Sequence, residues 1–368
     1  MSPASFPPTR VLVGMSGGVD STCAAALLLE AGLAVEGATL VVDDRGFAVA
    51  EEAAQIASQL GVPHHTLDVR DRFETLVARP FSEAYLQGKT PNPCVMCNPM
   101  LKFDSLLAQA ERLGLDRVAT GHYVAVGVHP ATGRFCLSRS RSGMKDQSYF
   151  LYRLSQSQLA RILFPLAHMD KPAVREMAAR KGLVTTSGQS VSDRKDSQDI
   201  CFIPDGDYRT YLQGRDAFGD NGKEGASGWI LDVSGKQIGK HSGAWQFTVG
   251  QRKGFEVKTT ERLYVLSKNT QSNTIVVGSI EEAMQQRVRL EDVVYSGWPQ
   301  IPPGSRLQAK IRSVASPADC TAATIEGDGG EIEVVFDQPV FAPAPGQSCV
   351  LYDHEHIVAV GLIREEAL

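Results

Sequence analysis

The sequence lacks any apolar run approaching the roughly 20 residues that a helix needs to cross a bilayer, so we expect no membrane insertion. Its start, MSPASFPPTR, has neither an apolar signal core nor an Arg-rich amphipathic pattern, and we therefore expect a cytoplasmic protein. Positive charge is not in excess either, because the net charge is −5. Any contact with nucleic acid must therefore come from a local basic surface.

Cysteine is scarce. The seven cysteines are an odd number in a long chain, which favours reduced thiols over a disulfide framework. Only one Cys-x-x-Cys pair occurs, at Cys94 and Cys97, and neither a second pair nor a His-x₃-His motif accompanies it. A structural zinc site is therefore not expected.

At 368 residues, the chain is long enough for two or three domains. Strand and helix signals alternate over its first half, which predicts an α/β domain with a parallel, Rossmann-like sheet. We expect strands near residues 10–14, 34–42, 62–68 and 117–121, and helices near 22–31, 47–60, 70–87 and 99–113. In such a sheet, ligands bind beyond the carboxyl ends of the strands.

The rest of the sequence indicates smaller, β-rich parts. A hairpin is predicted over residues 124–140, and three helices are expected to follow up to about residue 183. Gly-rich short segments after residue 208 predict a small, mostly β central domain, and period-2 alternation from about residue 283 predicts an antiparallel β-barrel. The expected domains are 1–207, 208–282 and 283–368.

A loop of small residues lies between the first expected strand and a helix-forming run. It consists of Gly14, Met15, Ser16, Gly17, Gly18, Val19, Asp20 and Ser21. Its glycines let backbone N–H groups approach an anion, and the helix start carries partial positive charge. The Gly-Lys-Ser/Thr of the usual nucleotide P-loop is missing. The loop resembles instead that of the pyrophosphatase-loop ATP enzymes, which transfer AMP to a substrate. Adenylation is the first hypothesis, and an ordinary Gly-rich turn is the alternative.

The fourth expected strand is followed by Gly121, His122 and Tyr123. Gly121 would let the backbone approach adenine or ribose closely, and the two aromatic side chains would reach a base. A tight turn with a capping histidine explains the same residues equally well.

The Cys-x-x-Cys pair lies in a proline-rich segment. Asn98 as N-cap and Pro99 at the first helical position would begin a helix directly after Cys97. Cys97 would then lie beside a helix N-terminus, which stabilises a thiolate and makes it a better nucleophile or ligand. A buried structural cysteine is the alternative.

Cys201 lies where a polar run meets an apolar one, which predicts a half-exposed thiol. Arg194 and Lys195 would depress its pKa if the loop folds back, whereas acidic and amide neighbours oppose this, so its role stays open. The remaining cysteines lie within apolar patterns and are expected in the core: Cys23, Cys136, Cys320 and Cys349.

Six motifs together resemble those of the tRNA-specific 2-thiouridylases, over nearly the whole chain. They are residues 14–21, 90–98, 119–123, 145–151, 196–203 and 250–254. The resemblance implies a pyrophosphatase-loop catalytic domain, a central domain and a C-terminal β-barrel. It also implies a sulfurtransferase that uses ATP to adenylate the C2 oxygen of the wobble uridine of tRNA. Sulfur from a cysteine persulfide then replaces that oxygen and gives 2-thiouridine, AMP and pyrophosphate.

The resemblance also implies roles for single residues. ATP lies on residues 14–21, Leu40 and Gly121. Cys97 is the nucleophile, Cys201 carries the incoming persulfide, and the two form a disulfide as sulfur leaves. Contacts with tRNA or its target base are implied for Asn92, Pro93, Cys94, His122, Lys145, Asp146, Gln147, Arg312 and Gln347. The implied partners are glutamate, glutamine and lysine tRNAs and a persulfide donor such as a cysteine desulfurase relay.

One position departs from the family pattern. Many members have Asp where this chain has Cys94, and that Asp is the proposed general acid or base. The change gives three cysteines that could together ligate a [4Fe-4S] cluster: Cys94, Cys97 and Cys201. One iron of such a cluster would stay open to bind sulfur. The alternative is that Cys94 is a neutral replacement of the Asp. Asp20 is a candidate ligand for a Mg²⁺ ion that offsets pyrophosphate charge.

Two other functions fit parts of the sequence. A pyrophosphatase-loop ligase that forms C–N bonds would need no paired cysteines. A non-catalytic RNA-binding protein would hold a structural metal with its cysteines and use basic residues for phosphate contacts that weaken with salt, unless these residues form an ordinary solvated face. The basic residues are Arg134, Arg139, Arg141, Lys145, Arg252 and Lys253.

Overall fold

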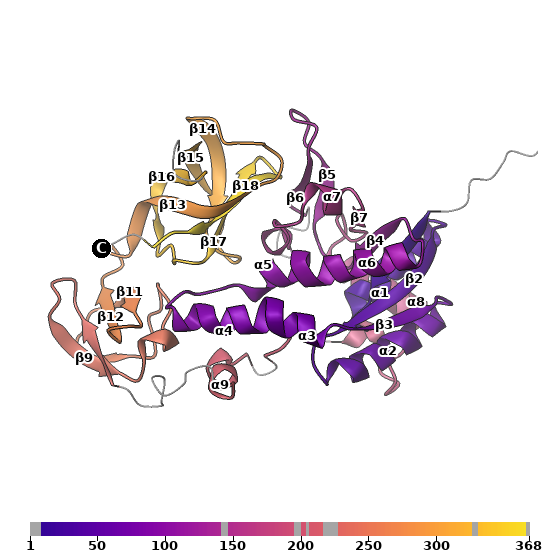
Figure 1. The fold of residues 1–368 in the computed structure, drawn as a ribbon, viewed down its shortest axis with the longest axis horizontal. Helices are drawn as coiled ribbons and strands as arrows, with labels where there is room; N and C mark the ends of the chain where they lie inside the picture. The colour runs from indigo at the N-terminus through magenta and orange to yellow at the C-terminus, as the bar shows by residue number, and fades with distance from the viewer. Residues whose placement is uncertain are drawn as a thin grey trace, which may run out of the picture. The chain divides into compact units, whose positions relative to one another are not determined.

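The computed structural model forms two compact units (Figure 1). It describes residues 9–140, 146–194, 200–203, 206–215, 227–325 and 330–365. The first unit draws its described residues from 1–77, 94–202 and 355–357, and the second from 78–93, 203–354 and 358–368. Lys145 and Lys195 therefore lie outside the described residues.

A parallel sheet of five strands forms the centre of the first unit, in the order β3-β2-β1-β4-β7. The strands are β1 (Arg10–Gly14), β2 (Ala34–Val41), β3 (His64–Asp68), β4 (Arg117–Thr120) and β7 (Ile162–Leu163). The four expected strands and the expected fold class are confirmed. Strand β7 was not predicted, because two residues are too few to form a recognisable pattern.

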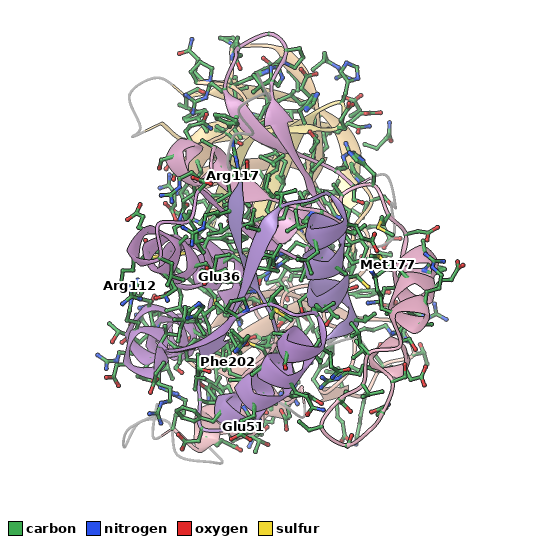
Figure 2. The ribbon with its side chains drawn as sticks, turned by 90° about the vertical axis from the view of Figure 1, so that its right-hand side faces the viewer. Glu36, Glu51, Arg112, Arg117, Met177 and Phe202 are labelled. Carbon is green, nitrogen blue, oxygen red and sulfur yellow. The ribbon has the colours of Figure 1, made fainter. Side chains whose placement is uncertain are left out.

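Helices cover both faces of this sheet, as an all-parallel sheet requires. They are α1 (Val19–Glu30), α2 (Gly46–Gln59), α6 (Asp104–Arg112) and α8 (Lys171–Lys181). The chain also forms the short helices α3 (Arg70–Phe73), α5 (Pro93–Cys97) and α7 (Gln156–Leu159). Helices α1, α2 and α8 share an apolar core with Val11 and Val13 of β1, whereas α6 packs against β4 and β1. Figure 2 shows Arg112 of α6 and Met177 of α8 on opposite sides of the strand that carries Glu36.

The helices observed in the first two hundred residues match the predicted ones only in part. Helical turns run without a break from α3 through η1 (Glu74–Ala78) and α4 (Arg79–Leu86), which confirms the helix predicted over 70–87. Of the three helices expected before residue 183, two are α7 and α8, and the first is only the 3₁₀ turn η3 (Ser148–Phe150). The predicted hairpin is present as β5 (Ala125–Val128) and β6 (Phe135–Ser138).

The second unit contains a five-stranded sheet in the order β10-β9-β8-β12-β11. Its strands are β8 (Gly228–Leu231), β9 (Gln237–His241), β10 (Glu256–Val257), β11 (Tyr264–Asn269) and β12 (Thr274–Gly278). Ile230, Val265 and Ile275 are fully buried in its core. A short helix that the sequence did not indicate, α9 (Tyr208–Gln213), precedes the sheet in the chain.

A closed antiparallel barrel completes the second unit and confirms the predicted β-barrel. The strand order is β13-β16-β15-β14-β17-β18, and β13 also pairs with β18. The strands are β13 (Met284–Tyr295), β14 (Ser305–Lys310), β15 (Ala318–Thr324), β16 (Ile332–Phe341), β17 (Ser348–Asp353) and β18 (His356–Ile363). Alternate residues of β16, namely Ile332, Val334 and Phe336, point into the barrel core.

Within the described ranges, no helix has the length and apolar character needed to cross a bilayer.

Candidate active site

The loop between β1 and α1 is held in shape by its own hydrogen bonds. The backbone N–H of Ser16 donates to Ser21 Oγ at 3.1 Å, and Ser21 Oγ donates to the Gly18 carbonyl at 3.1 Å. Gly17 has a φ of +68°, a conformation that side chains with a Cβ rarely adopt. These features fix the loop against the first turn of α1, where unpaired N–H groups attract an anion.

A cavity of about 400 Å³ lies at the carboxyl ends of β1 and β4. Strands β2 and β4 flank β1 on opposite sides, and such a switch point is where open α/β sheets bind ligands. Every predicted ATP-loop residue except Gly17 lines the cavity, as do Leu40, Gly121, His122 and Gln147. Two lysines that sequence analysis did not single out, Lys102 and Lys171, line it as well.

Gly121 packs directly against the start of α1. A Cβ at this position would lie 2.6 Å from the carbonyl carbon of Asp20 and 2.7 Å from the backbone nitrogen of Ser21. Backbone atoms at these distances cannot move aside without a large cost in free energy. The packing of the two loops that form the cavity therefore requires glycine here. An approach of Gly121 to adenine or ribose stays a prediction.

Asp20 does not fit the magnesium site predicted for it. Lys171 Nζ lies 2.8 Å from both carboxylate oxygens, and the Tyr123 hydroxyl donates to Oδ1 at 2.6 Å. The carboxylate is therefore already neutralised and hydrogen-bonded by protein groups. Tyr123 lines the cavity, but it is buried and its hydroxyl is bound to Asp20, so its contact with a base stays a prediction. The hypothesis of a Mg²⁺ ion on Asp20 is corrected accordingly.

Lys171 is a functional candidate that sequence reasoning missed. It is the first residue of α8, and its side chain is only 11% exposed. A cation in the first turn of a helix opposes the helix dipole. This unfavourable placement is the signal by which the sequence could have revealed it.

The helix that carries Cys94 and Cys97 begins earlier than expected. Helical geometry starts at Pro93 and continues from α5 through η2 (Asn98–Phe103) into α6. Pro93 suits the first turn of a helix, and the π-helical turn η2 accommodates Pro99. Cys97 therefore lies inside a helix and not beside an N-terminus.

The thiols of this helix are consequently less acidic than predicted. Burial raises the pKa of Cys97 to about 11, and burial also raises the pKa of the Cys94 thiol. The expectation of an intrinsically stabilised Cys97 thiolate is wrong. Lys102 partly offsets the effect of burial at both thiols.

Cys201 is on the surface of the first unit, beside Phe202, whose ring packs edge-to-face on Phe73 with centroids 5.1 Å apart. Although the residue is exposed, surrounding atoms desolvate its thiol and raise its pKa, while Lys102 lowers that pKa. A charge on Cys201 raises the pKa of Cys94 and of Cys97. The three thiols therefore lie within electrostatic range of one another and of Lys102.

The cysteines do not form a metal centre in this structure. All seven are free thiols, so a Cys97–Cys201 disulfide stays a prediction about the reaction. Among the described residues, no three His, Cys, Asp or Glu side chains are arranged to hold a metal ion. Cys94, Cys97 and Cys201 thus do not fit a [4Fe-4S] cluster as they are placed here. The predicted core cysteines are confirmed, since none is more than 1% exposed: Cys23, Cys136, Cys320 and Cys349.

His122 forms a neutral wall of the cavity. Its Nδ1 lies 2.7 Å from Thr120 Oγ1, and its ring packs between those of Phe103 and Phe164. Desolvation, together with the charge of Lys102, holds the pKa of His122 well below its usual value. A neutral imidazole offers one donor or acceptor to the edge of a base.

The comparisons with known proteins agree along the whole chain. Three family models match it: tRNA methyl transferase HUP domain over residues 9–205, tRNA methyl transferase PRC-barrel domain over 220–279, and Aminomethyltransferase beta-barrel domain over 285–363. The chain is 42% identical over 365 residues to the tRNA-specific 2-thiouridylase MnmA of Syntrophotalea carbinolica, covering 96% of this chain and 98% of that protein. The chain belongs to the MnmA family. The MnmA protein of Heliobacterium modesticaldum is 41% identical over 364 residues, covering 96% of this chain and 92% of that relative.

Two predicted tRNA-contacting residues of this MnmA-family chain follow β6 in the sequence. The Gln147 side-chain carbonyl accepts the Tyr123 N–H at 2.9 Å, which fixes Gln147 at the cavity. Asp146 accepts hydrogen bonds from the backbone N–H groups of Ser140 and Ser148 and so shapes the turn. Their contacts with tRNA stay predictions, as does that of Lys145, which lies outside the described residues.

Four further predicted tRNA-contacting residues belong to the second unit: Asn92, Pro93, Arg312 and Gln347. Arg312 Nη2 donates to the carbonyls of Phe341 and Ala342 at 2.9 and 2.6 Å. Gln347 Nε2 donates to the carbonyl of Thr90 at 2.6 Å. Thr90 lies two residues before Asn92 in the sequence. Asn92 is half-buried and Pro93 is buried. Arg312 and Gln347 therefore order the backbone of this unit, and a role toward tRNA in this MnmA-family chain remains a prediction.

Reactivity of Cys97 should depend on pH and on Lys102. Because burial raises the pKa of Cys97 to about 11, the thiolate fraction grows as pH rises toward that value. We expect the alkylation rate to rise about tenfold per pH unit between roughly pH 7 and 10. Lys102 lowers this pKa, so Lys102→Ala should slow alkylation by about threefold to tenfold near neutral pH.

Iodoacetamide labelling followed by mass spectrometry of the Cys97 peptide would measure these rates. Lys181→Ala serves as the control, because Lys181 pairs with Glu30 on the surface. A plateau in the rate near pH 8, as an acidic thiol would give, would contradict the prediction.

Proposed function

We propose that this chain synthesises 2-thiouridine in tRNA by adenylating the C2 oxygen of the wobble uridine and then exchanging that oxygen for sulfur. The observation that carries the proposal is the position of Lys102. It lines the same cavity as the predicted ATP loop, and its charge acts on Cys94, Cys97 and Cys201. An adenylating loop and sulfur-carrying thiols at one site are what the two-step reaction requires. Membership of the MnmA family supports the same conclusion.

The first step activates an oxygen that is otherwise a poor leaving group. The C2 oxygen of the uridine attacks the α-phosphorus of ATP, so that a new O–P bond forms and the bond to pyrophosphate breaks. Backbone N–H groups of the loop and the start of α1 stabilise the departing pyrophosphate. Lys102, which lines the cavity, offsets the charge that develops.

The second step replaces the activated oxygen. The terminal sulfur of a persulfide on Cys201 attacks C2, and AMP leaves with the oxygen. The Cys97 thiolate then attacks Cys201 Sγ, the S–S bond breaks, and the terminal sulfur remains on the uridine as a thiocarbonyl. Cys97 and Cys201 are left as a disulfide, which an external thiol reduces.

The chemistry names two classes of partner. The wobble uridine of glutamate, glutamine and lysine tRNAs is the proposed target, and it must leave the stack to enter a cavity. His122 and Gln147 line that cavity and offer polar groups to a base edge. Cys201 is exposed, as a thiol must be to accept a persulfide from a donor such as a cysteine desulfurase relay.

The test is sulfur transfer by the wild-type protein. Unmodified tRNA, ATP, a cysteine desulfurase system and labelled sulfur are combined, and nucleosides and AMP are analysed. Label in the wobble uridine with release of AMP is expected. AMP without sulfur in the tRNA would refute thiolation and favour a C–N ligase. Salt-sensitive tRNA binding without AMP would favour a non-catalytic RNA-binding protein.

A further inference from the structure

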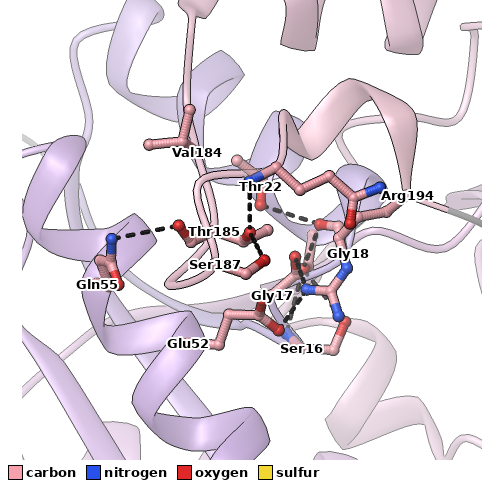
Figure 3. Close-up of polar contacts among 12 residues, drawn as sticks. Ser16, Gly17, Gly18, Thr22, Glu52, Gln55, Val184, Thr185, Ser187 and Arg194 are labelled. Atoms are coloured by element: carbon pink, nitrogen blue, oxygen red, sulfur yellow. Dashed lines mark hydrogen bonds and ion pairs between the residues drawn. The ribbon is translucent and has the colours of Figure 1, made fainter.

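Arg194 contacts the outer side of the ATP loop. Its Nη1 donates to the Gly17 carbonyl at 2.8 Å and to Glu52 Oε2 at 2.6 Å (Figure 3). Both side chains of the ion pair are largely covered, with 29% of Arg194 and 17% of Glu52 exposed. The catalytic steps described above use neither residue. The partly buried, charge-assisted hydrogen bond from Arg194 to the loop carbonyl is therefore not explained by those steps.

The geometry of the peptide bond gives this contact a consequence inside the cavity. A trans peptide is planar, so the carbonyl of Gly17 and the N–H of Gly18 point in opposite directions. Gly18 lines the cavity, whereas Gly17 does not. When Arg194 holds the carbonyl outward, the N–H of Gly18 is directed toward the space where phosphate would lie.

Glycine at position 17 is what makes this arrangement accessible. A Cβ there would lie 3.1 Å from Arg194 Nη1 and 3.5 Å from Glu52 Oε2, and the φ of +68° disfavours any side chain. The same freedom lets a glycine peptide rotate when it is not held. An external contact that fixes the peptide therefore removes a conformational cost from anion binding.

Side chains of helix α2 hold Arg194 and the segment before it in position. Glu52, Gln55 and Gln59 lie on one face of α2, at helical spacing. Gln55 and Gln59 bond the backbone of the segment that leads to Arg194. Gln59 exchanges two hydrogen bonds with Val184, at 2.7 and 3.0 Å. Gln55 donates to the Thr185 carbonyl (Figure 3). The glutamines anchor this segment, and Glu52 orients the guanidinium.

We propose that Arg194, oriented by Glu52, is a positioning residue that presets the Gly17–Gly18 peptide for binding the phosphates of ATP. This inference rests on the proposed use of ATP. It predicts that Arg194→Ala weakens ATP binding by about tenfold to hundredfold, the effect of one charge-assisted hydrogen bond. Glu52→Gln keeps the shape of the side chain but removes its charge, so it should weaken binding less, in the same direction.

Calorimetric titration of the full chain with ATP tests the proposal. Gln59→Ala is the matched control, because it removes two bonds from the same segment to the same helix without touching the loop. It should bind ATP like the wild type. Millimolar guanidinium should restore part of the affinity of Arg194→Ala and leave that of Gln59→Ala unchanged, which a general loss of structure would not produce.

Two results would overturn the inference. Wild-type affinity in Arg194→Ala would show that the contact does not prepare the loop. An equal loss in Gln59→Ala would show that only the anchoring of the segment matters. Absence of ATP binding by the wild type would instead refute the proposed function together with this inference, so the two failures are distinguishable.

Discussion

Replacement of Cys97 by serine is expected to lower sulfur incorporation into tRNA by at least about 1,000-fold, while pyrophosphate release in the first turnover stays within about threefold of the wild type. The serine hydroxyl keeps the shape of the side chain but does not ionise near neutral pH, and it cannot resolve a persulfide into a disulfide. Adenylation needs no thiol, so the first step should continue. Labelled sulfur in the wobble uridine and pyrophosphate are quantified in the same reaction.

Cys201→Ser should show the same pattern, because it removes the atom proposed to carry the persulfide. Cys320→Ala is the control, since Cys320 is buried in the barrel core and has no proposed role. Thiolation that survives in Cys97→Ser would rule out Cys97 as the resolving nucleophile. Loss of both sulfur transfer and first-turnover pyrophosphate release in Cys97→Ser would indicate damage to the adenylation site rather than a missing thiol.

Gly121→Ala is expected to be the most damaging single-methyl change at the cavity. The added Cβ would lie 2.6 and 2.7 Å from backbone atoms of Asp20 and Ser21, so β4 and the start of α1 must move apart. Overpacking of this kind costs about 1–3 kcal/mol. Because the displaced backbone belongs to the ATP loop, kcat/KM for AMP formation should fall by about 100-fold or more.

Thermal unfolding and AMP formation measured on the same preparation separate the two effects. Gly127→Ala is a matched control, because Gly127 lies in β5, where an added Cβ would meet no atom of the described residues within 4 Å. It should match the wild type in both measurements. Near wild-type kcat/KM in Gly121→Ala would mean that the two loops do not need their close packing for ATP use.

The strands of the α/β domain and the turn between β1 and α1 could be predicted because their signals are local. Val11, Leu12 and Val13 form a continuous apolar run, as a strand buried on both faces requires. The glycines after them allow the positive φ that Gly17 adopts in a tight turn. Reliance on local signals also explains the errors. Strand β7 has too few residues to show a pattern. Pro93 and Pro99 are both compatible with a helix start, and the helix begins at Pro93 instead of the predicted Pro99.

Long-range partners could not be predicted. Lys171 is 151 residues from Asp20, yet its ammonium group binds that carboxylate and thereby removes the predicted magnesium ligand. Arg194 bonds Gly17 across 177 residues. Nothing in the local sequence of either cation indicates its partner, because such contacts depend on how α8 and the segment after it return to the sheet.

The sequence by itself determined the class of the fold, the loop expected to hold ATP and the cysteines available for sulfur chemistry, since each depends on residue type and spacing within a short window. The tertiary structure alone decided the surroundings of those groups and hence their charge and reactivity. It buried the Cys97 thiol and raised its pKa, placed Lys102 where its charge reaches three thiols and the cavity, and set Arg194 against Gly17. Charge and desolvation depend on distance in space, and distance in space follows only from the complete fold.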